Sequence, residues 1–252
     1  DPASLTARLS ALGIVALDRD VRRLTRSELA VHFGAHSSGR ILLAPLIRSI
    51  LWQAYVRILS GLEAPDLGNL RTFWYRWVKP VLAHIPDDDT ARTDPYDTML
   101  AAFSTLVLDE QLFAYRDFDF TDEAWEHRRI GTTRPDVLVF AEKAGWVRFL
   151  RETHAELGVS TLALGGAPSA LTSEYTARHV TEALGRPGPI RLVGIVDYDP
   201  SGAIIARAFA KQFVQTGLPA SGPTEFVIDP RHYEPEEIET FKFPLPPREK
   251  TK

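Results

Sequence analysis

The sequence of 252 residues contains no cysteine, only one methionine and no long hydrophobic run. Without cysteine the chain forms neither a disulfide framework nor a thiolate zinc site, and it has no cysteine nucleophile. No apolar stretch approaches the roughly 20 residues of a membrane span, and no signal peptide is recognisable. We therefore expect a cytoplasmic protein without a membrane partner.

An excess of positive charge is also lacking, because the net charge is −4. A negative total counts mildly against a polyanionic partner, since binding phosphates requires a positive field. Basic residues are nevertheless clustered locally. One cluster comprises Arg19, Arg22, Arg23 and Arg26, and the other comprises Arg128, Arg129 and Arg134. Each cluster is equally well explained as a solvated surface.

The first half of the chain has a helical pattern. Apolar residues recur at helical spacing over 41–62, 69–85 and 96–113, and Asn69 is a good N-cap for the second of these helices. Residues 113–131 then alternate aromatic and charged side chains, as a short hairpin or an extended wing does. Helices followed by a hairpin predict a winged-helix (CAP-like) domain over 40–133, with 1–39 as an N-terminal helical extension.

The pattern changes in the second half. Apolar runs at 136–142, 160–166, 190–199 and 224–229 are separated by amphipathic helical segments. Strands that alternate with helices of this length predict an α/β domain, over 134–252, with a mostly parallel four-stranded sheet. Ligands of such sheets bind outside the carboxyl ends of the strands.

Three acidic residues fall at those strand ends. Glu142 ends the first predicted strand, and Asp197 and Asp199 end the third. Gly165 and Gly166 end the second strand and would leave space beside the acids. Carboxylate oxygens without nearby histidine or cysteine favour Mg²⁺ over zinc. The alternative is that Glu142 forms an ion pair with Lys143 or an arginine, while the aspartates cap the following helix.

These motifs resemble the Toprim domain that topoisomerases, primases and some nucleases share. "VLVFAEKAGWVRFL" is similar to its glutamate-bearing strand and helix, and "LVGIVDYDPSG" to its D-x-D strand. The second motif is most similar to the A subunit of topoisomerase VI and its meiotic double-strand-break relatives. The turn "LGGAPS" departs from that family, because it is shorter and lacks the lysine often found there.

The same family carries a nucleophilic tyrosine on its winged-helix domain, in the context R-x-x-aromatic-Tyr. "NLRTFWYRW" is similar to it and identifies Arg71, Trp74 and Tyr75. The resemblance implies that Tyr75 attacks a DNA phosphodiester. Arg71, one helical turn earlier, would stabilise the charge that develops in the transition state. The alternative is that Tyr75 is a packing residue, as most tyrosines of amphipathic helices are.

The resemblance implies a DNA-cleaving A-type subunit of a type IIB topoisomerase-like enzyme, nucleoid-associated if prokaryotic. Glu142, Asp197 and Asp199 would hold Mg²⁺, with Glu142 also catalytic, and Arg128, Arg129 and Arg134 would contact double-stranded DNA. The family assembles its active site between two subunits, which implies a homodimer. Because the chain has no P-loop motif, strand passage would need a separate GHKL-type ATPase B subunit.

Other readings of the residues stay open. One is a hydrolytic Toprim nuclease of the plasmid-defence type, in which Tyr75 only packs. Another is a non-catalytic DNA-binding subunit with a relict acidic site. A phosphate-handling enzyme for small molecules is disfavoured, because the helical half shows no pattern of a second substrate pocket.

Overall fold

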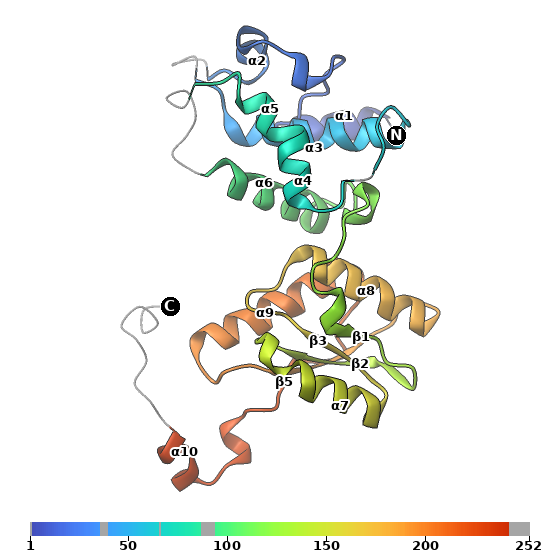
Figure 1. Ribbon diagram of the computed structural model, residues 1–252, viewed down its shortest axis with the longest axis vertical. Helices are drawn as coiled ribbons and strands as arrows, with labels where there is room; N and C mark the ends of the chain where they lie inside the picture. Colours follow the sequence, from blue (N-terminus) through green and yellow to red (C-terminus); the bar gives the residue numbers. More distant parts are fainter. Residues whose placement is uncertain (1, 36–39, 66, 87–93, 242–252) are drawn as a thin grey trace. The chain divides into compact units, whose positions relative to one another are not determined.

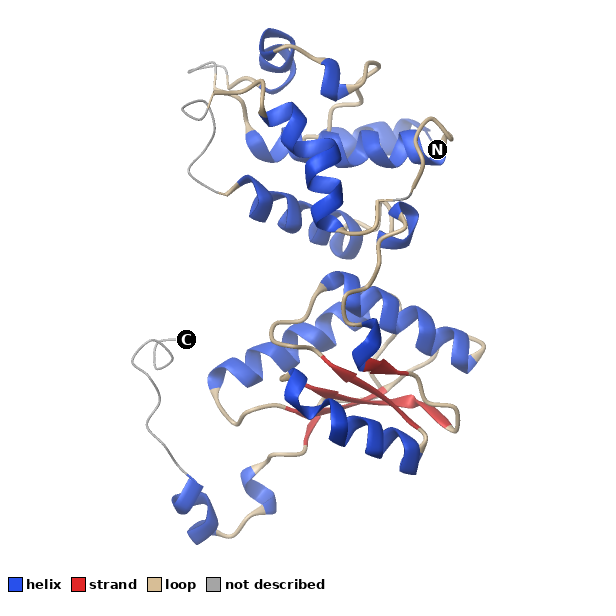
Figure 2. Cartoon of the chain, in the orientation of Figure 1, coloured by secondary structure: helices blue, strands red, loops and turns tan. Residues whose placement is uncertain are grey.

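A computed structural model describes residues 2–35, 40–65, 67–86 and 94–241 of the chain. The chain divides into two compact units, Asp1–Thr121 and Asp122–Lys252. We refer to them as the helical unit and the α/β unit, because among the described residues only the second contains strands (Figure 2). In the described part of the chain, no helix has both the length and the apolar character that a bilayer span requires.

The helical unit is organised around α3 (Leu43–Leu59), the longest of its described helices. The other elements are α1 (Pro2–Ala11), η1 (Val21–Arg23), α2 (Arg26–Phe33), α4 (Leu70–Phe73), η2 (Trp74–Val78), α5 (Lys79–Leu82), α6 (Pro95–Ser104), η4 (Thr105–Asp109) and η5 (Tyr115–Phe118). Its core is aromatic, since Phe73, Phe103 and Phe118 are fully buried and meet edge to face, with ring centroids 5.0–5.8 Å apart. The cap at Asn69 is confirmed, because its side-chain oxygen accepts the Thr72 N–H at 2.8 Å.

The N-terminal residues, expected to form a helical extension, belong to this compact unit. Gln53 of α3 accepts the Val21 N–H at 2.8 Å and donates to the carbonyls of Leu17 and Arg19. Ser49, one turn earlier, accepts the Val15 N–H at 2.9 Å. These side chains satisfy backbone groups of a segment that has little regular structure, which fixes that segment along α3.

The helix that carries Tyr75 contains one π-helical turn, η2. The Lys79 N–H donates to the carbonyl of Trp74, five residues earlier. Pro80 follows directly and has no N–H with which to continue the α-helical ladder, and its ring would crowd the carbonyl four residues before it. Widening the preceding turn relieves this conflict, as π-bulges do in other helices.

The α/β unit begins with η6 (Trp125–His127) and β1 (Arg128–Arg129). It continues with β2 (Arg134–Ala141), η7 (Ala144–Trp146), α7 (Val147–Leu157), β3 (Val159–Ala163), α8 (Ala170–Leu184), β4 (Arg191–Ile195), α9 (Pro200–Gln215), β5 (Glu225–Phe226), η8 (Pro230–His232) and α10 (Pro235–Phe241). All four strands expected in this half are present and pair in parallel, in the order β3-β2-β4-β5. The sheet has five strands, however, and the prediction of four was wrong.

The fifth strand comes from the segment predicted as a wing. No hairpin forms over 113–131; β1 instead pairs antiparallel with β3 at the edge of the sheet. Arg128 of β1 is buried and forms an ion pair with the buried Asp122, which also accepts a hydrogen bond from Thr172 of α8 at 3.1 Å. These contacts attach residues 122–133 to the α/β unit, so the domain boundary lies before Asp122 rather than before Arg134.

Helices cover both faces of the sheet, α8 and α9 on one and α7 on the other (Figure 1). Alternate residues of β2 point to opposite faces, as the strand repeat requires. Leu138 and Phe140 pack with α8 and α9, whereas Val139 and Ala141 pack with Leu150 of α7. This arrangement leaves the carboxyl ends of the parallel strands as the edge at which polar side chains collect.

Candidate functional site

Two of the predicted acids meet where β2 and β4 end. These strands are neighbours with Ala141 opposite Ile195, and the Glu142 N–H continues the ladder by donating to the Ile195 carbonyl at 3.0 Å. The Glu142 carboxylate then accepts the backbone N–H of Asp197 at 3.4 Å. The pairing of the strands thus brings Glu142 and Asp197 together, as their positions in the sequence predicted.

Lys143 forms an ion pair with one of these acids, Asp197. Lys143 Nζ donates to the Asp197 carboxylate at 2.5 Å. This hydrogen bond, the charge of Asp197 and the charges of Glu142 and Asp199 raise the pKa of Lys143 above its ordinary value. All three predicted acids therefore act on one ammonium group. Lys143 forms its ion pair with Asp197 and not, as the alternative had expected, with Glu142.

Asp199 has a structural task as well. It is the N-cap of α9, and its carboxylate accepts the Gly202 N–H at 2.7 Å. Gly202 is required by close approach, since a Cβ built on it would lie 2.2 Å from the carbonyl oxygen of Asp197. The D-x-D-P-x-G pattern thus has a backbone reason: the first turn of α9 packs directly on the backbone that carries Asp197.

Gly165 and Gly166 form the neighbouring turn, after β3. Their φ values are 72° and 126°, and the Gly166 N–H donates to the Glu142 carbonyl at 2.8 Å. A Cβ at either glycine would meet nothing within 4 Å. Glycine is favoured here by its backbone conformation, and the space around both positions is open.

The chemistry of these donors fits Mg²⁺. This ion is commonly bound by one or two carboxylates together with water and substrate phosphate, rather than by a complete protein cage. Glu142 and Asp197 supply two carboxylates at one edge, and Asp199 is close enough to influence the same lysine. Among the described residues, no group of three or more acidic, histidine or cysteine side chains has the geometry of a metal site.

Sequence reasoning gave no role to Asp229, the acid that follows β5 at the same edge. Arg231 donates four hydrogen bonds to the Asp229 carboxylate at 2.6–3.0 Å, three from its guanidinium and one from its backbone N–H. These bonds lower the pKa of Asp229 to about 2. Tyr198 is close enough to Arg231 to influence its pKa, which relates Asp229 to the D-x-D motif. The signal was the repeated Asp-Pro: Asp199–Pro200 and Asp229–Pro230 each follow a parallel strand.

The candidate nucleophile lies in the helical unit, on an exposed face. Tyr75 is 52% exposed, and its ring lies under the ammonium group of Lys79, with Nζ 4.9 Å from the ring centroid. Arg71, one turn before Tyr75, is exposed as well. Tyr75 is about half exposed, whereas its neighbours Phe73 and Trp77 are fully buried.

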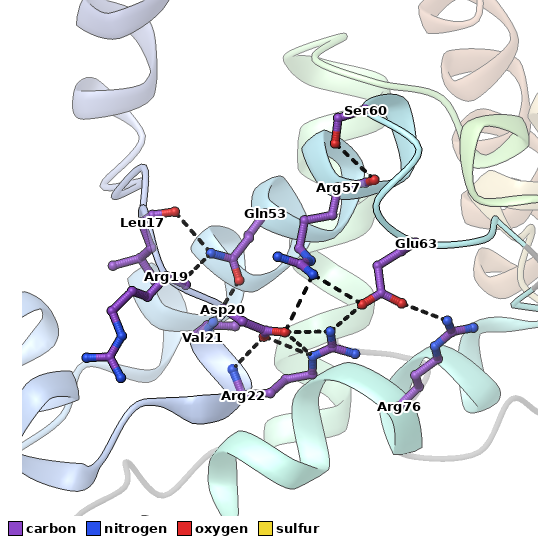
Figure 3. A network of polar contacts seen from close by, with 10 residues as sticks. All are labelled: Leu17, Arg19, Asp20, Val21, Arg22, Gln53, Arg57, Ser60, Glu63 and Arg76. Atoms are coloured by element: carbon purple, nitrogen blue, oxygen red, sulfur yellow. Dashed lines mark hydrogen bonds and ion pairs between the residues drawn. The ribbon is translucent and has the colours of Figure 1, made fainter.

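A network of charged side chains holds η2, the π-helical turn that contains Tyr75 (Figure 3). Glu63 accepts hydrogen bonds from Arg76 of η2, at 2.8 Å, and from Arg22 of η1, and it also forms an ion pair with Arg57 of α3. The Arg22 guanidinium in turn lies 4.0 Å from the ring centroid of Trp77. One carboxylate therefore joins Arg76 of the π-helical turn to Arg22 of η1 and Arg57 of α3.

The three arginines predicted to contact DNA differ in their surroundings. Arg128 is buried against Asp122 and is not available to a phosphate, so this prediction was wrong. Arg129 is half-buried and donates at 2.8 Å to the carbonyls of Glu126 and Arg128, while Arg134 is exposed at the start of β2. Burial of Arg128 follows from the fifth strand, which the sequence pattern did not reveal.

Neither a protein-family model, nor a curated protein, nor a solved structure matches this chain.

Proposed function

We propose that this chain is the DNA-cleaving A-type subunit of a type IIB topoisomerase-like enzyme. The observation that carries the proposal is the contact between the Glu142 carboxylate and the Asp197 backbone, beside Lys143, at the carboxyl edge of a parallel sheet. Acids grouped at such an edge favour binding of a phosphorylated ligand through a cation. The proposal includes the winged-helix and Toprim assignments of the two units.

Glu142 and Asp197 would hold Mg²⁺, with Asp199 contributing from the start of α9. The ion would neutralise the scissile phosphate and fix its position. Lys143 is a second cation at the same place, and a phosphate oxygen is a suitable partner for its ammonium group when Asp197 turns to the metal.

Tyr75 would supply the nucleophile. Its phenolic oxygen forms a bond to phosphorus as the bond from phosphorus to the departing sugar oxygen breaks, and the phenolic proton ends on the departing hydroxyl. One phosphodiester replaces another, so neither an oxidant nor an external energy source is needed. The ammonium group of Lys79 lies 4.9 Å from the centroid of the Tyr75 ring and is a cation beside the proposed nucleophile.

Tyr75 and the acids belong to different units, and in the family that the chain resembles the site forms between two subunits. We therefore propose a homodimer that cuts both strands of a DNA duplex. Strand passage would be driven by a separate GHKL-type ATPase subunit.

A second function is favoured by one observation. The segment expected to form the DNA-binding wing is part of the α/β sheet, and its Arg128 is buried. A hydrolytic Toprim nuclease requires only the acidic edge and a water nucleophile, so it depends on neither the wing nor Tyr75.

Incubation with supercoiled plasmid and Mg²⁺, followed by a denaturing quench, tests the proposal directly. We expect protein covalently attached to DNA ends, and loss of this adduct in Tyr75→Phe. Tyr96→Phe is the matched control, because Tyr96 lies in the same unit and packs edge to face on Trp74. Glu142→Gln and Asp197→Asn are expected to abolish cleavage.

The outcomes separate the candidate functions. Cleavage with free ends that persists in Tyr75→Phe would identify a hydrolytic nuclease. DNA binding without cleavage, unchanged in Glu142→Gln and in the presence of an ATPase subunit encoded nearby, would identify a non-catalytic DNA-binding subunit.

A further inference from the structure

Exposed aromatic rings lie in the segments that carry the candidate metal-binding acids. Trp146, four residues after Glu142, is 40% exposed, and Phe149 at the start of α7 is 45% exposed. Tyr198, between Asp197 and Asp199, is 72% exposed. Burial of a large apolar side chain contributes about 1.5–3 kcal/mol to folding, and these rings gain only part of it. Leu150 of the same helix, which is 1% exposed, provides the packing against the sheet.

The positions of Trp146 and Phe149 are well defined. Trp146 ends η7, the short turn that leads from Glu142 into α7, and its N–H donates to the Lys143 carbonyl at 3.2 Å. The rings of Trp146 and Phe149 meet edge to face, with centroids 5.8 Å apart and planes at 76°. In this geometry the edge of one ring contacts the other, and flat ring surface stays accessible for stacking.

The charges around these rings favour a polyanionic partner. Lys143 precedes Trp146, and the exposed Arg148 and Arg151 follow it on the first two turns of α7. Glu152, in the middle of this helix, forms an exposed ion pair with Arg148, and Glu156 lies toward the carboxyl end. Exposed ion pairs contribute only about 0–1 kcal/mol, so a phosphate can replace Glu152 as the partner of Arg148. Basic side chains therefore lie at the end of α7 nearest to Glu142. Aromatic rings among basic side chains are the composition of single-strand nucleic-acid surfaces.

We infer that Trp146 and Phe149 form a stacking surface for an unpaired base of the DNA strand whose phosphate is bound at the acidic edge. This inference rests on the proposed function and adds that the substrate is opened, or already unpaired, beside the scissile phosphate. Bases within a duplex are stacked on one another, so only an unpaired base presents its face to Trp146. The basic side chains would contact the phosphates on either side of it.

The inference is tested by measuring how tightly the protein binds a short, fluorescently labelled oligothymidylate. Binding is monitored by fluorescence anisotropy in the absence of Mg²⁺. Loss of an aromatic stacking partner typically weakens binding by about 1–3 kcal/mol per base, so we expect Trp146→Ala to raise Kd about 5- to 150-fold. Trp146→Tyr is expected to restore most of the affinity. Leu157→Ala is the matched control, because Leu157 lies at the other end of α7 and is 50% exposed. An abasic strand is expected to bind the protein and Trp146→Ala equally.

Three results would overturn the inference. If Trp146→Ala binds oligothymidylate as tightly as Leu157→Ala does, while the plasmid is still cut, the stacking surface is wrong and the proposed function stands. If the unmodified chain binds neither single-stranded nor duplex DNA, both fail. If Trp146→Ala shifts sedimentation from dimer to monomer without changing oligothymidylate affinity, the rings form an interface with a second copy of the chain.

Discussion

In the α/β unit the candidate acids lie where strands end, and backbone contacts hold them there. The Glu142 N–H extends the β2–β4 ladder, and the first turn of α9 packs on the carbonyl of Asp197 at Gly202. In the helical unit, Tyr75 lies on an exposed helix face beside a turn that side chains hold, chiefly through Glu63. The difference shows two ways of positioning a reactive group: by the topology of a sheet, or by ion pairs between segments.

The largest expected effect concerns the extent of the α/β unit. Asp122→Asn leaves the Arg128 guanidinium buried without its counter-ion, and breaking a buried pair in this way costs about 3–5 kcal/mol. Amide exchange of β2, β3 and β4 would measure the loss. Glu152→Gln is the control, because its ion pair with Arg148 is exposed and such pairs contribute about 0–1 kcal/mol. Equal effects of the two variants would mean that the ion pair does not hold residues 122–133 on the sheet.

The next effect tests whether the backbone positions Asp197. Gly202→Ala places a Cβ 2.2 Å from the Asp197 carbonyl oxygen, so α9 and the strand end must separate. Overpacking of this kind costs about 1–3 kcal/mol. We expect weaker Mg²⁺ binding by titration calorimetry as well as a lower melting temperature. Gly145→Ala, at the same edge with open space around its Cβ, is expected to change neither. Normal Mg²⁺ binding by Gly202→Ala would show that the acids do not depend on this contact.

Much of the α/β unit could be predicted from the sequence, and the reason is its topology. Parallel strands separated by helices place their carboxyl ends together, so the positions of Glu142 and Asp197 in the chain were sufficient to predict that they meet. The short strand β1 could not be predicted, because two residues carry no periodic pattern. Arg128 was predicted to be a surface cation for the same reason. Its ion pair with Asp122 could not be predicted without knowing that β1 pairs with β3.

A smaller effect is expected from the side-chain network of the helical unit. Glu63→Gln removes the negative charge shared by Arg22, Arg57 and Arg76, and hydrogen bonds to charged groups contribute about 1.5–3 kcal/mol each where they are not fully solvated. We expect a loss of about 1–2 kcal/mol, because water and the neighbouring Asp20 compensate in part. Amide exchange of residues 74–79 would be accelerated.

Glu110→Gln is the matched control, since Glu110 pairs with Arg8 across an exposed contact of 3.4 Å in the same unit. Unchanged exchange of residues 74–79 in Glu63→Gln would contradict the role of the network and would leave the aromatic core as the support of the Tyr75 helix.

Less of this unit could be predicted. The helices and the cap at Asn69 follow from local pattern, but the contacts of Glu63 join residues up to 41 positions apart and leave no periodic signal. The π-helical turn comes directly before Pro80, and the conflict that a proline creates in an α-helix is a local signal that the sequence does contain. Whether Tyr75 faces solvent depends on how far the wider turn rotates the helix about its axis. A regular helical repeat does not predict this rotation.

The smallest expected effect is on the pH dependence of unfolding of the helical unit. Burial would raise the pKa of Glu63, but hydrogen bonds from Arg22 and Arg76 outweigh it and hold the pKa below the ordinary 4.5. A carboxylate with a lowered folded-state pKa stabilises the fold above its ordinary pKa, and this contribution is lost as pH falls through the folded value. We therefore expect the free energy of unfolding of the helical unit to decline as pH drops below 4.5, and to decline less in Glu63→Gln.

Urea unfolding followed by tryptophan fluorescence reports on this unit, because Trp77 is fully buried there while Trp125 and Trp146 are exposed. Equal declines in both proteins would mean that Glu63 does not take up a proton on unfolding. In that case Asp20, whose pKa is also lowered by Arg22, would account for the acid sensitivity, and the turn beside Tyr75 would be held by Arg22 over Trp77.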